Sequence, residues 1–193
     1  MTARHELPTP GPAAKLAETF AALAPVITTD RLVLRAPKLS DFPACAEIAG
    51  SEHGRFIGGP MGREDAWAEF AKMTAGWMLH GHGGFTIVDA ADVTVYGFVI
   101  LGLEPGDLEI ELGFALTQTG EGKSIAFEAA SAVRDWAARE LNLSGLVSYI
   151  DPDNARSIAL ATRLKAVRDS EAEAALNDEG TLVFRHPVKE MSS

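Results

Sequence analysis

Two spacings of hydrophobic residues alternate along this 193-residue chain, and each predicts its own kind of element. Apolar residues at every second position are typical of strands, and those three or four positions apart are typical of helices. The first spacing, with one continuous apolar run, predicts strands over residues 31–36, 85–89, 95–103, 108–116, 146–150 and 181–186. The second predicts helices over residues 13–24, 42–49, 63–79 and 155–164, and one after the turn near residue 122 that continues to residue 140.

In three of these helices the apolar residues mark the side expected to face a core. These stripes are Leu16, Phe20 and Leu23; then Trp67, Phe70, Ala71, Thr74 and Met78; then Ile125, Ala129, Val133 and Trp136. The order of elements is strand, two helices, three hairpin-linked strands, helix, strand, helix and strand. That order predicts an α+β fold, with a single mixed, mostly antiparallel sheet flanked by helices.

The segment 115–130, A-L-T-Q-T-G-E-G-K-S-I-A-F-E-A-A, joins a predicted strand to a predicted helix through a glycine-bearing turn. Such a turn points backbone N–H groups at whatever lies above the helix N-terminus, where the helix dipole is positive. The segment therefore predicts a phosphate site. Its occupant is either the pyrophosphate of coenzyme A or a nucleoside triphosphate.

Composition narrows the classes of function. A net charge of −10 argues against an extended nucleic-acid surface, although a local basic cleft stays open. A single cysteine, Cys45, excludes an internal disulfide and indicates a reducing compartment. His80 and His82 lie in a glycine-rich loop without other metal-ligand types close by, so we expect no metal site. No apolar run approaches the ~20 residues of a membrane span, and we expect a cytoplasmic protein with no membrane partner.

Four stretches, within about residues 26–187, carry a resemblance to a known family. They read T-T-D-R-L-V-L-R-A-P at 28–37, E-L-G-F-A-L at 111–116, E-G-K-S-I-A-F-E-A-A at 121–130 and D-P-D-N-A-R-S-I-A-L-A at 151–161. In this order and spacing the chain resembles the GNAT acetyltransferase superfamily, especially its RimJ/RimL-like branch. The resemblance implies the GNAT-like acyl-CoA N-acyltransferase fold, with acetyl-CoA as acyl donor. It also implies a partly mobile N-terminal extension with a short helix (1–25), an acetyltransferase domain (26–187) and a C-terminal tail (188–193).

The resemblance further implies where acetyl-CoA binds. In the family it lies where two central strands splay apart, so that the strand matching 108–116 pairs with the pantetheine arm. The following turn cradles the pyrophosphate through backbone N–H groups. Asn154 and Ser157 match the family's N-x-x-S near the pantetheine and sulfur, although Asn154 also suits a helix N-cap. The implied cofactor-binding residues are Phe114, Ala115, Leu116, Gln118, Glu121, Gly122, Lys123, Ser124, Ile125, Asn154 and Ser157.

Three positions depart from the family's pattern. Ser124 stands where glycine or alanine is usual, and a serine is comfortable there only if its φ stays negative. Its hydroxyl either donates to a phosphate or weakens the site. Ala161 stands where many relatives carry a tyrosine that acts as an acid, so that mechanism is not carried over. Lys165 replaces a glycine of a turn, and we expect a structural effect.

Attack of an amine on a thioester needs a base for the amine's proton and donors for the oxyanion and the departing thiolate. Glu111 is the predicted base, because Glu109 lies two residues away on the same strand face and neighbouring carboxylates raise each other's pKa. The alternative is that both carboxylates face solvent. By resemblance, an N–H within 114–116 serves the oxyanion and Ser157 serves the thiolate. The acceptor is a primary amine, either a protein N-terminus or a small-molecule amine.

Two other interpretations stay open. Gly122, Lys123 and Ser124 spell the end of a P-loop, but Thr117 stands at its first glycine and several hairpin-linked strands come before it. A GNAT-like domain that binds an acyl-CoA or a partner with little or no catalysis is the second alternative. The sequence also leaves the oligomeric state open, with a homodimer as one option.

Overall fold

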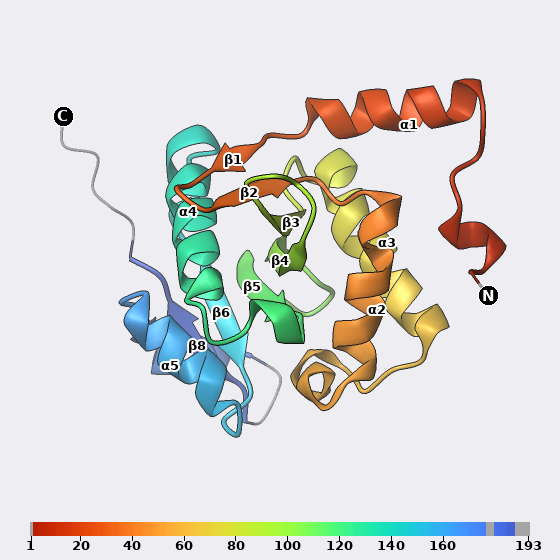
Figure 1. The fold of residues 1–193 in the computed structure, drawn as a ribbon. Helices are drawn as coiled ribbons and strands as arrows, with labels where there is room; N and C mark the ends of the chain where they lie inside the picture. Colours follow the sequence, from red (N-terminus) through yellow and green to blue (C-terminus); the bar gives the residue numbers. More distant parts are fainter. Residues whose placement is uncertain (1, 177–179, 188–193) are drawn as a thin grey trace.

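One mixed sheet organises the molecule (Figure 1). The computed structural model describes residues 2–176 and 180–187, so the predicted tail 188–193 lies outside the described residues. Within them, eight strands lie in the order β1-β2-β3-β4-β5-β6-β8-β7, and β5–β6 is the one parallel pair. This confirms the predicted α+β fold with a mixed, mostly antiparallel sheet. The strands are β1 Ile27–Thr28, β2 Leu32–Arg35, β3 Gly84–Asp89, β4 Val95–Gly102, β5 Glu111–Leu116, β6 Val147–Ile150, β7 Val167–Arg168 and β8 Leu182–Arg185.

Helices cover both faces of this sheet (Figure 1). A core cluster with Phe42, Ile48 and Phe70 joins α2 and α3 to one face, and a second cluster joins α4 to the other. The predicted stripe of α4 is confirmed, because all four of its residues are buried. The helices of the described residues are α1 Pro12–Leu23, α2 Phe42–Gly50, α3 Arg63–Leu79, α4 Ile125–Glu140, α5 Ala155–Arg163 and α6 Ser170–Ala175.

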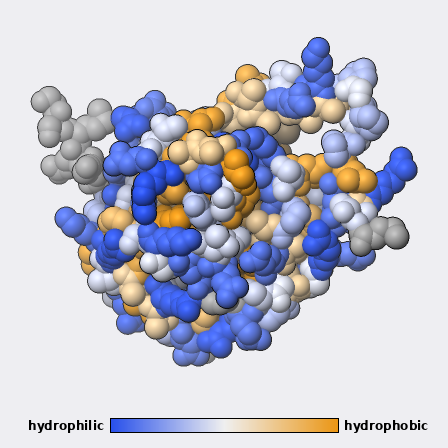
Figure 2. All heavy atoms as spheres, viewed as in Figure 1, coloured by the Kyte–Doolittle hydropathy of each residue, from blue (hydrophilic) through white to orange (hydrophobic). Residues whose placement is uncertain are grey.

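The apolar stripe predicted for the first helix does not face a core. Helix α1 forms where it was predicted, yet all of it is described and none of its residues is buried. Its Leu23 is 78% exposed. The helix stands off the body as an arm, and Figure 2 shows tan and orange surface along it. Periodicity alone cannot tell whether an apolar stripe has a partner to pack against.

The packing face of α3 is rotated from the predicted one. Its buried residues are Ala66, Phe70 and Met73, and Trp77 packs at the edge of the core. Met78, which the prediction placed inside, is 73% exposed. A helix with apolar residues all around its circumference offers several stripes, and contacts with the sheet select one of them.

The strand predicted over 108–116 begins at Glu111 instead of residue 108. The backbone N–H groups of Leu108 and Glu109 donate to the Tyr149 hydroxyl, at 3.3 and 3.2 Å, and this replaces strand pairing there. The short elements β1, β7 and α6 were not predicted. Each is too short to show a periodic pattern.

A buried ion pair fixes the first half of the sheet to α2. Asp41, 2% exposed, accepts hydrogen bonds from the Arg35 guanidinium (2.7 and 3.1 Å), the Lys38 N–H (2.8 Å) and the Thr86 hydroxyl (2.8 Å). Thr86 lies on β3 and Arg35 on β2, so one carboxylate joins two strands to the start of a helix. Its partners satisfy the lone pairs that burial would otherwise leave without hydrogen bonds.

We expect Asp41→Ala to lower the free energy of unfolding by about 3 kcal/mol, because it leaves the Arg35 charge without its buried partner. Urea denaturation measures this loss. Lys38→Ala is the control, since Lys38 pairs with Asp92 at the surface and its loss should cost under about 1 kcal/mol. Equal losses in the two variants would contradict the role given to the buried carboxylate.

Candidate active site

The central strands β5 and β6 part soon after they meet. Within the described residues, Glu111 and Val147 are the one pair of Cα partners between them. The Val147 N–H donates to the Ile110 carbonyl at 3.1 Å, so the backbone groups of Ile110 point toward β6. Alternate residues point the same way, and the backbone groups of Phe114 and Leu116 therefore face the opening gap. Ala115 pairs instead with Phe98 of β4.

At the far end of β5 a tight turn leads into α4. It runs through a 3-10 turn, Gln118–Gly120, and then through Gly122 with φ +71°. Gly120 must be glycine, since a Cβ there would lie 2.5 Å from the Tyr96 carbonyl oxygen. The N–H groups of the first turn of α4 have no acceptor within the helix and face the space beyond its end. This arrangement fits an anion.

Fewer backbone N–H groups of this turn are available to an anion than the sequence predicted. The Gly120 N–H donates to the Thr117 carbonyl at 2.9 Å, and the Glu121 N–H donates to the Gln118 carbonyl at 3.3 Å. The N–H groups of Gly120 and Glu121 are therefore used within the turn, and the anion must be bound by other donors.

Ser124 does not keep the negative φ that was expected of it. Its backbone is left-handed, with φ +60° and ψ +18°, directly before α4. Its hydroxyl accepts a hydrogen bond from Arg163 at 3.1 Å. A non-glycine residue in this region is strained by about 1 kcal/mol, so neighbouring contacts must stabilise the turn.

Those contacts come from Thr29 and Arg31, which lie between β1 and β2 at one edge of the sheet. Arg31 donates to the Lys123 carbonyl at 3.2 Å from both terminal nitrogens, and its Nε lies 2.8 Å from the Glu128 carboxylate. Thr29 donates to the same carboxylate. Glu128 lies in the first turn of α4, where a carboxylate also favours the helix dipole. Arg31 thus clamps the turn from both sides of Ser124.

Cations gather at this turn although the chain carries a net charge of −10. The Arg163 guanidinium stacks 4.1 Å from the centre of the Phe127 ring, and the Lys123 ammonium lies 5.6 Å from that of Tyr96. Arg156 forms an ion pair with Glu121 at 3.0 Å. Sequence reasoning missed Arg31, Arg156 and Arg163 as site residues, although Arg31 and Arg156 lie inside the family-like stretches. Nothing in the spacing of Arg163 marked it.

The ion pair between Arg156 and Glu121 holds the start of α5 beside the turn that precedes α4. The Asn154 side chain accepts from the Ser157 N–H at 3.1 Å, which confirms its expected N-cap role. The Ser157 hydroxyl stays a predicted thiolate donor. Ala161 is fully buried, and Lys165 directly follows Leu164, the C-cap of α5, with φ +63°. A left-handed residue at a helix end is where glycine is usual, so the effect of Lys165 is structural.

Glu111 and Glu109 lie in different surroundings. Glu111 is half-buried, and its pKa is raised to about 7, first by burial and then by the charges of Asp107 and Glu104. A backbone hydrogen bond from Tyr149 and the Lys72 charge act the other way. Glu109 does not raise it as predicted. Two hydrogen bonds from Arg185, both 2.7 Å, hold the pKa of Glu109 below its usual range.

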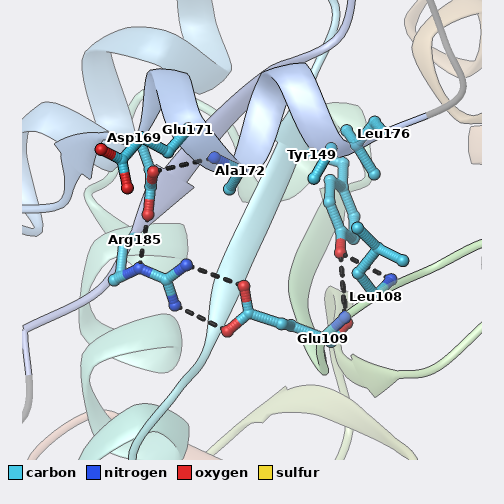
Figure 3. Close-up of a pocket in the computed structure, with 9 residues that line it drawn as sticks. Leu108, Glu109, Tyr149, Asp169, Glu171, Ala172, Leu176 and Arg185 are labelled. Atoms are coloured by element: carbon cyan, nitrogen blue, oxygen red, sulfur yellow. Dashed lines mark hydrogen bonds and ion pairs between the residues drawn. The ribbon is translucent and has the colours of Figure 1, made fainter.

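Glu109 belongs to a neighbouring pocket of about 220 Å³ (Figure 3). There Arg185 lies between Glu109 and Asp169, and Tyr149 points its hydroxyl at the backbone of Leu108 and Glu109, just before β5. Glu111 is not among the lining residues. The carboxylate of Glu111 lies instead alongside Gly113, where a Cβ would be 3.6 Å from Oε1. The alternative in which both carboxylates face solvent is therefore wrong for Glu111.

Neither a metal site nor a membrane span is found in the described residues. No group of three or more His, Cys, Asp or Glu side chains is placed to hold a metal ion there. His82 is buried and its Nδ1 lies 2.7 Å from the Leu101 carbonyl oxygen, so its role is structural. No helix in the described part of the chain is long and apolar enough to cross a membrane.

Residues 31–167 match the Acetyltransferase (GNAT) domain. An acetyltransferase from Agrobacterium tumefaciens is 36% identical, with a TM-score of 0.78 over 84% of this chain and 94% of that one. The chain belongs to the GNAT acetyltransferase family. It is an N-acetyltransferase whose acyl donor is acetyl-CoA.

More distant structures share the fold. RimL, a ribosomal L7/L12 alpha-N-protein acetyltransferase in complex with coenzyme A, is 19% identical with a TM-score of 0.67, over 85% of this chain and 98% of that one. A Salmonella typhimurium acetyltransferase that modifies the N-terminal serine of L7/L12 is 18% identical with a TM-score of 0.68, over 86% and 100%. The family match includes the Gly122-Lys123-Ser124 turn, which therefore belongs to a GNAT sheet and not to a P-loop.

We expect Ser124→Gly to raise the free energy of unfolding by up to about 1 kcal/mol, because glycine adopts a positive φ without strain. Ser131→Gly is the matched control, since Ser131 lies inside α4, where glycine should cost about 0.5 kcal/mol. Urea denaturation of the two variants compares them. A loss of stability in both would show that Ser124 is not strained.

Proposed function

We propose that this acetyltransferase acts on a primary amine by direct attack in a ternary complex, with Glu111 as the general base. The observation that carries the proposal is the half-buried Glu111, with a pKa of about 7, at the point where β5 and β6 part. A carboxylate with that pKa is ionised in part near neutral pH and still basic enough to accept a proton.

The roles of the other groups follow from their places around the gap. Acetyl-CoA supplies a thioester whose carbonyl carbon the neutral amine attacks. Glu111 accepts the proton that the amine loses, directly or through water. The Phe114 or Leu116 backbone N–H donates to the oxyanion, since that of Ala115 faces β4, and the Ser157 hydroxyl donates to the thiolate as the C–S bond breaks. The turn from Gly122 to Ile125 binds the pyrophosphate, with support from Lys123 and Arg163.

The acceptor is a protein N-terminus or a small-molecule amine. Glu104 and Asp107 lie close enough to Glu111 to raise its pKa, and such an acidic surround favours an amine that arrives as a cation. A place in the RimJ/RimL-like branch is supported by the shared fold of RimL, which acts on the N-terminus of a ribosomal protein.

The remaining expectations stay predictions. They comprise the cytoplasmic location, the absence of a nucleic-acid partner, the option of a homodimer and the division at residues 25 and 187. A catalytically weak acyl-CoA-binding domain is the alternative to full activity, because Ser124, Ala161 and Lys165 depart from the family pattern.

We expect acetyl-CoA and CoA to raise the melting temperature and Mg-ATP to leave it unchanged. We also expect free thiol to be released from acetyl-CoA with at least one member of a panel of peptides and small amines. Stabilisation without thiol release from any amine would support the catalytically weak alternative. Absence of stabilisation at millimolar acetyl-CoA would contradict donor binding itself.

We expect kcat/KM for the amine to rise with pH through about 7, as Glu111 loses its proton. Glu111→Gln should lower it by roughly 10²–10³ and remove this dependence, because the amide cannot accept a proton. Glu109→Gln is the matched control on the same strand, and it should keep the rise near pH 7. Loss of the rise in both variants would argue against Glu111 as the base.

Stability offers a readout of the same group that does not depend on activity. Its pKa is raised above the ordinary 4.5, so the folded state holds a proton that the unfolded state releases. Stability is therefore lost as pH rises from about 4.5 to about 7. Glu111→Gln should be more stable than wild type above pH 7, and the difference should vanish below pH 4. An unchanged difference across this range would rule out the raised pKa.

A further inference from the structure

A side-chain hydroxyl lies at the point where β5 and β6 part. The Ser148 Oγ donates to the Leu112 carbonyl oxygen at 2.7 Å, one residue beyond the Glu111–Val147 pair on each strand. The Leu112 carbonyl points toward β6, as that of Ile110 does. The next backbone donor along β6, the Tyr149 N–H, acts on the Glu111 carboxylate and lowers its pKa, against the effect of burial. The hydroxyl thus satisfies a buried carbonyl just where regular pairing ends.

A buried histidine fixes the direction of this hydroxyl. His186, 3% exposed, has its Nε2 2.9 Å from the Ser148 Oγ. A serine hydroxyl has one proton, and the carbonyl can only accept, so Ser148 gives its proton to Leu112. The histidine Nε2 must then carry a proton and donate to Ser148. The backbone N–H of His186 also donates to the Leu146 carbonyl at 2.9 Å, which holds the residue beside β6.

The other ring nitrogen supports this assignment. Nδ1 of His186 is buried and has no hydrogen-bond partner among the described residues. Burial, and then the nearby Arg134 charge, lower the pKa of His186 to about 4. The ring is therefore neutral at ordinary pH, with its single proton on Nε2. The two hydrogen bonds therefore run in one direction: the His186 Nε2–H donates to the Ser148 hydroxyl, and that hydroxyl donates to the Leu112 carbonyl.

We propose that Ser148 and His186 are positioning residues that set where β5 leaves β6. By holding the Leu112 carbonyl, the pair fixes the strand just before Phe114, whose backbone groups face the gap. It thereby sets the width of the gap beside the acyl donor's pantetheine arm. This inference rests on the proposed function, because it concerns the gap in which the thioester is attacked.

The test separates the two halves of coenzyme A. Isothermal titration calorimetry compares CoA with 3′-phospho-ADP, its nucleotide half, which lacks the pantetheine arm. The turn before α4 would bind the nucleotide half, and the gap would bind the arm. For Ser148→Ala we expect the affinity for CoA to fall about tenfold, equal to ~1.4 kcal/mol, with that for 3′-phospho-ADP unchanged. The KM for acetyl-CoA should rise by a similar factor with little change in kcat.

Two histidine variants test the chain of hydrogen bonds. His186→Gln keeps a donor near the Nε2 position and should retain most of the affinity for CoA. His186→Phe keeps the ring but has no donor, and it should resemble Ser148→Ala. The double variant Ser148→Ala with His186→Phe should lose no more than either alone, since the two residues act as a unit.

Thr74→Val is the matched control, because its hydroxyl also donates to a carbonyl, that of Phe70, at 2.7 Å, but on α3. It should leave the affinity for CoA unchanged. Ser148→Cys keeps the volume and donates weakly, so the comparison does not depend on one variant folding. Equal losses for CoA and 3′-phospho-ADP, or unchanged affinity for CoA, would overturn the inference. Wild type that binds neither acetyl-CoA nor CoA would overturn the proposed function instead.

Discussion

The interruption of pairing between β5 and β6 is the constraint on which the rest of this structure depends. Two parallel strands that share a single Cα pair, Glu111 with Val147, leave backbone donors and acceptors of β5 facing a gap. Unpaired backbone groups that are buried cost free energy, so such a gap persists only if other groups hold the strands apart. Here β4 holds β5 from one side and β8 holds β6 from the other. The gap is therefore a position for an extra extended chain, which the pantetheine arm of acetyl-CoA suits.

The anion site beyond the gap depends on contacts from the sheet edge that β1 and β2 form. Gly122 and Ser124 both have positive φ, and this turns the chain sharply enough to aim N–H groups outward. Arg31 binds the Lys123 carbonyl and the Glu128 carboxylate, and so ties the chain between β1 and β2 to the N-terminus of α4. The backbone strain at Ser124 is offset by hydrogen bonds of Arg31, whose partner Glu128 lies 97 positions away in the sequence.

The sequence predicted what local pattern determines. The stripe of α4, the turn before it and the Asn154 cap follow from spacing and residue type within a dozen positions. It could not predict which partner neutralises Glu109, because Arg185 lies 76 residues away and reaches it only after β6 and β8 pair. The predictions of which face of α3 is buried, and that the stripe of α1 is buried, were wrong for the same reason: packing partners decide which apolar face is covered. The left-handed Ser124 was missed because its stabilising contacts, Arg31 and Arg163, are distant in sequence.

The two ends of the gap carry opposite charge, which under the proposed function separates the binding sites of the two substrates. Lys123 and Arg163 flank the turn that suits phosphates, whereas the charges of Asp107 and Glu104 act on Glu111 and outweigh that of Lys72, which pairs with Glu104 at 2.8 Å. An amine in water at neutral pH is a cation, so the acidic end attracts it but must then remove its proton before attack. The same carboxylates that attract the ammonium raise the pKa of Glu111 and make it a stronger base. In the proposed mechanism, recruitment of the acceptor and its deprotonation are coupled through one local field, which a uniform net charge of −10 would not provide.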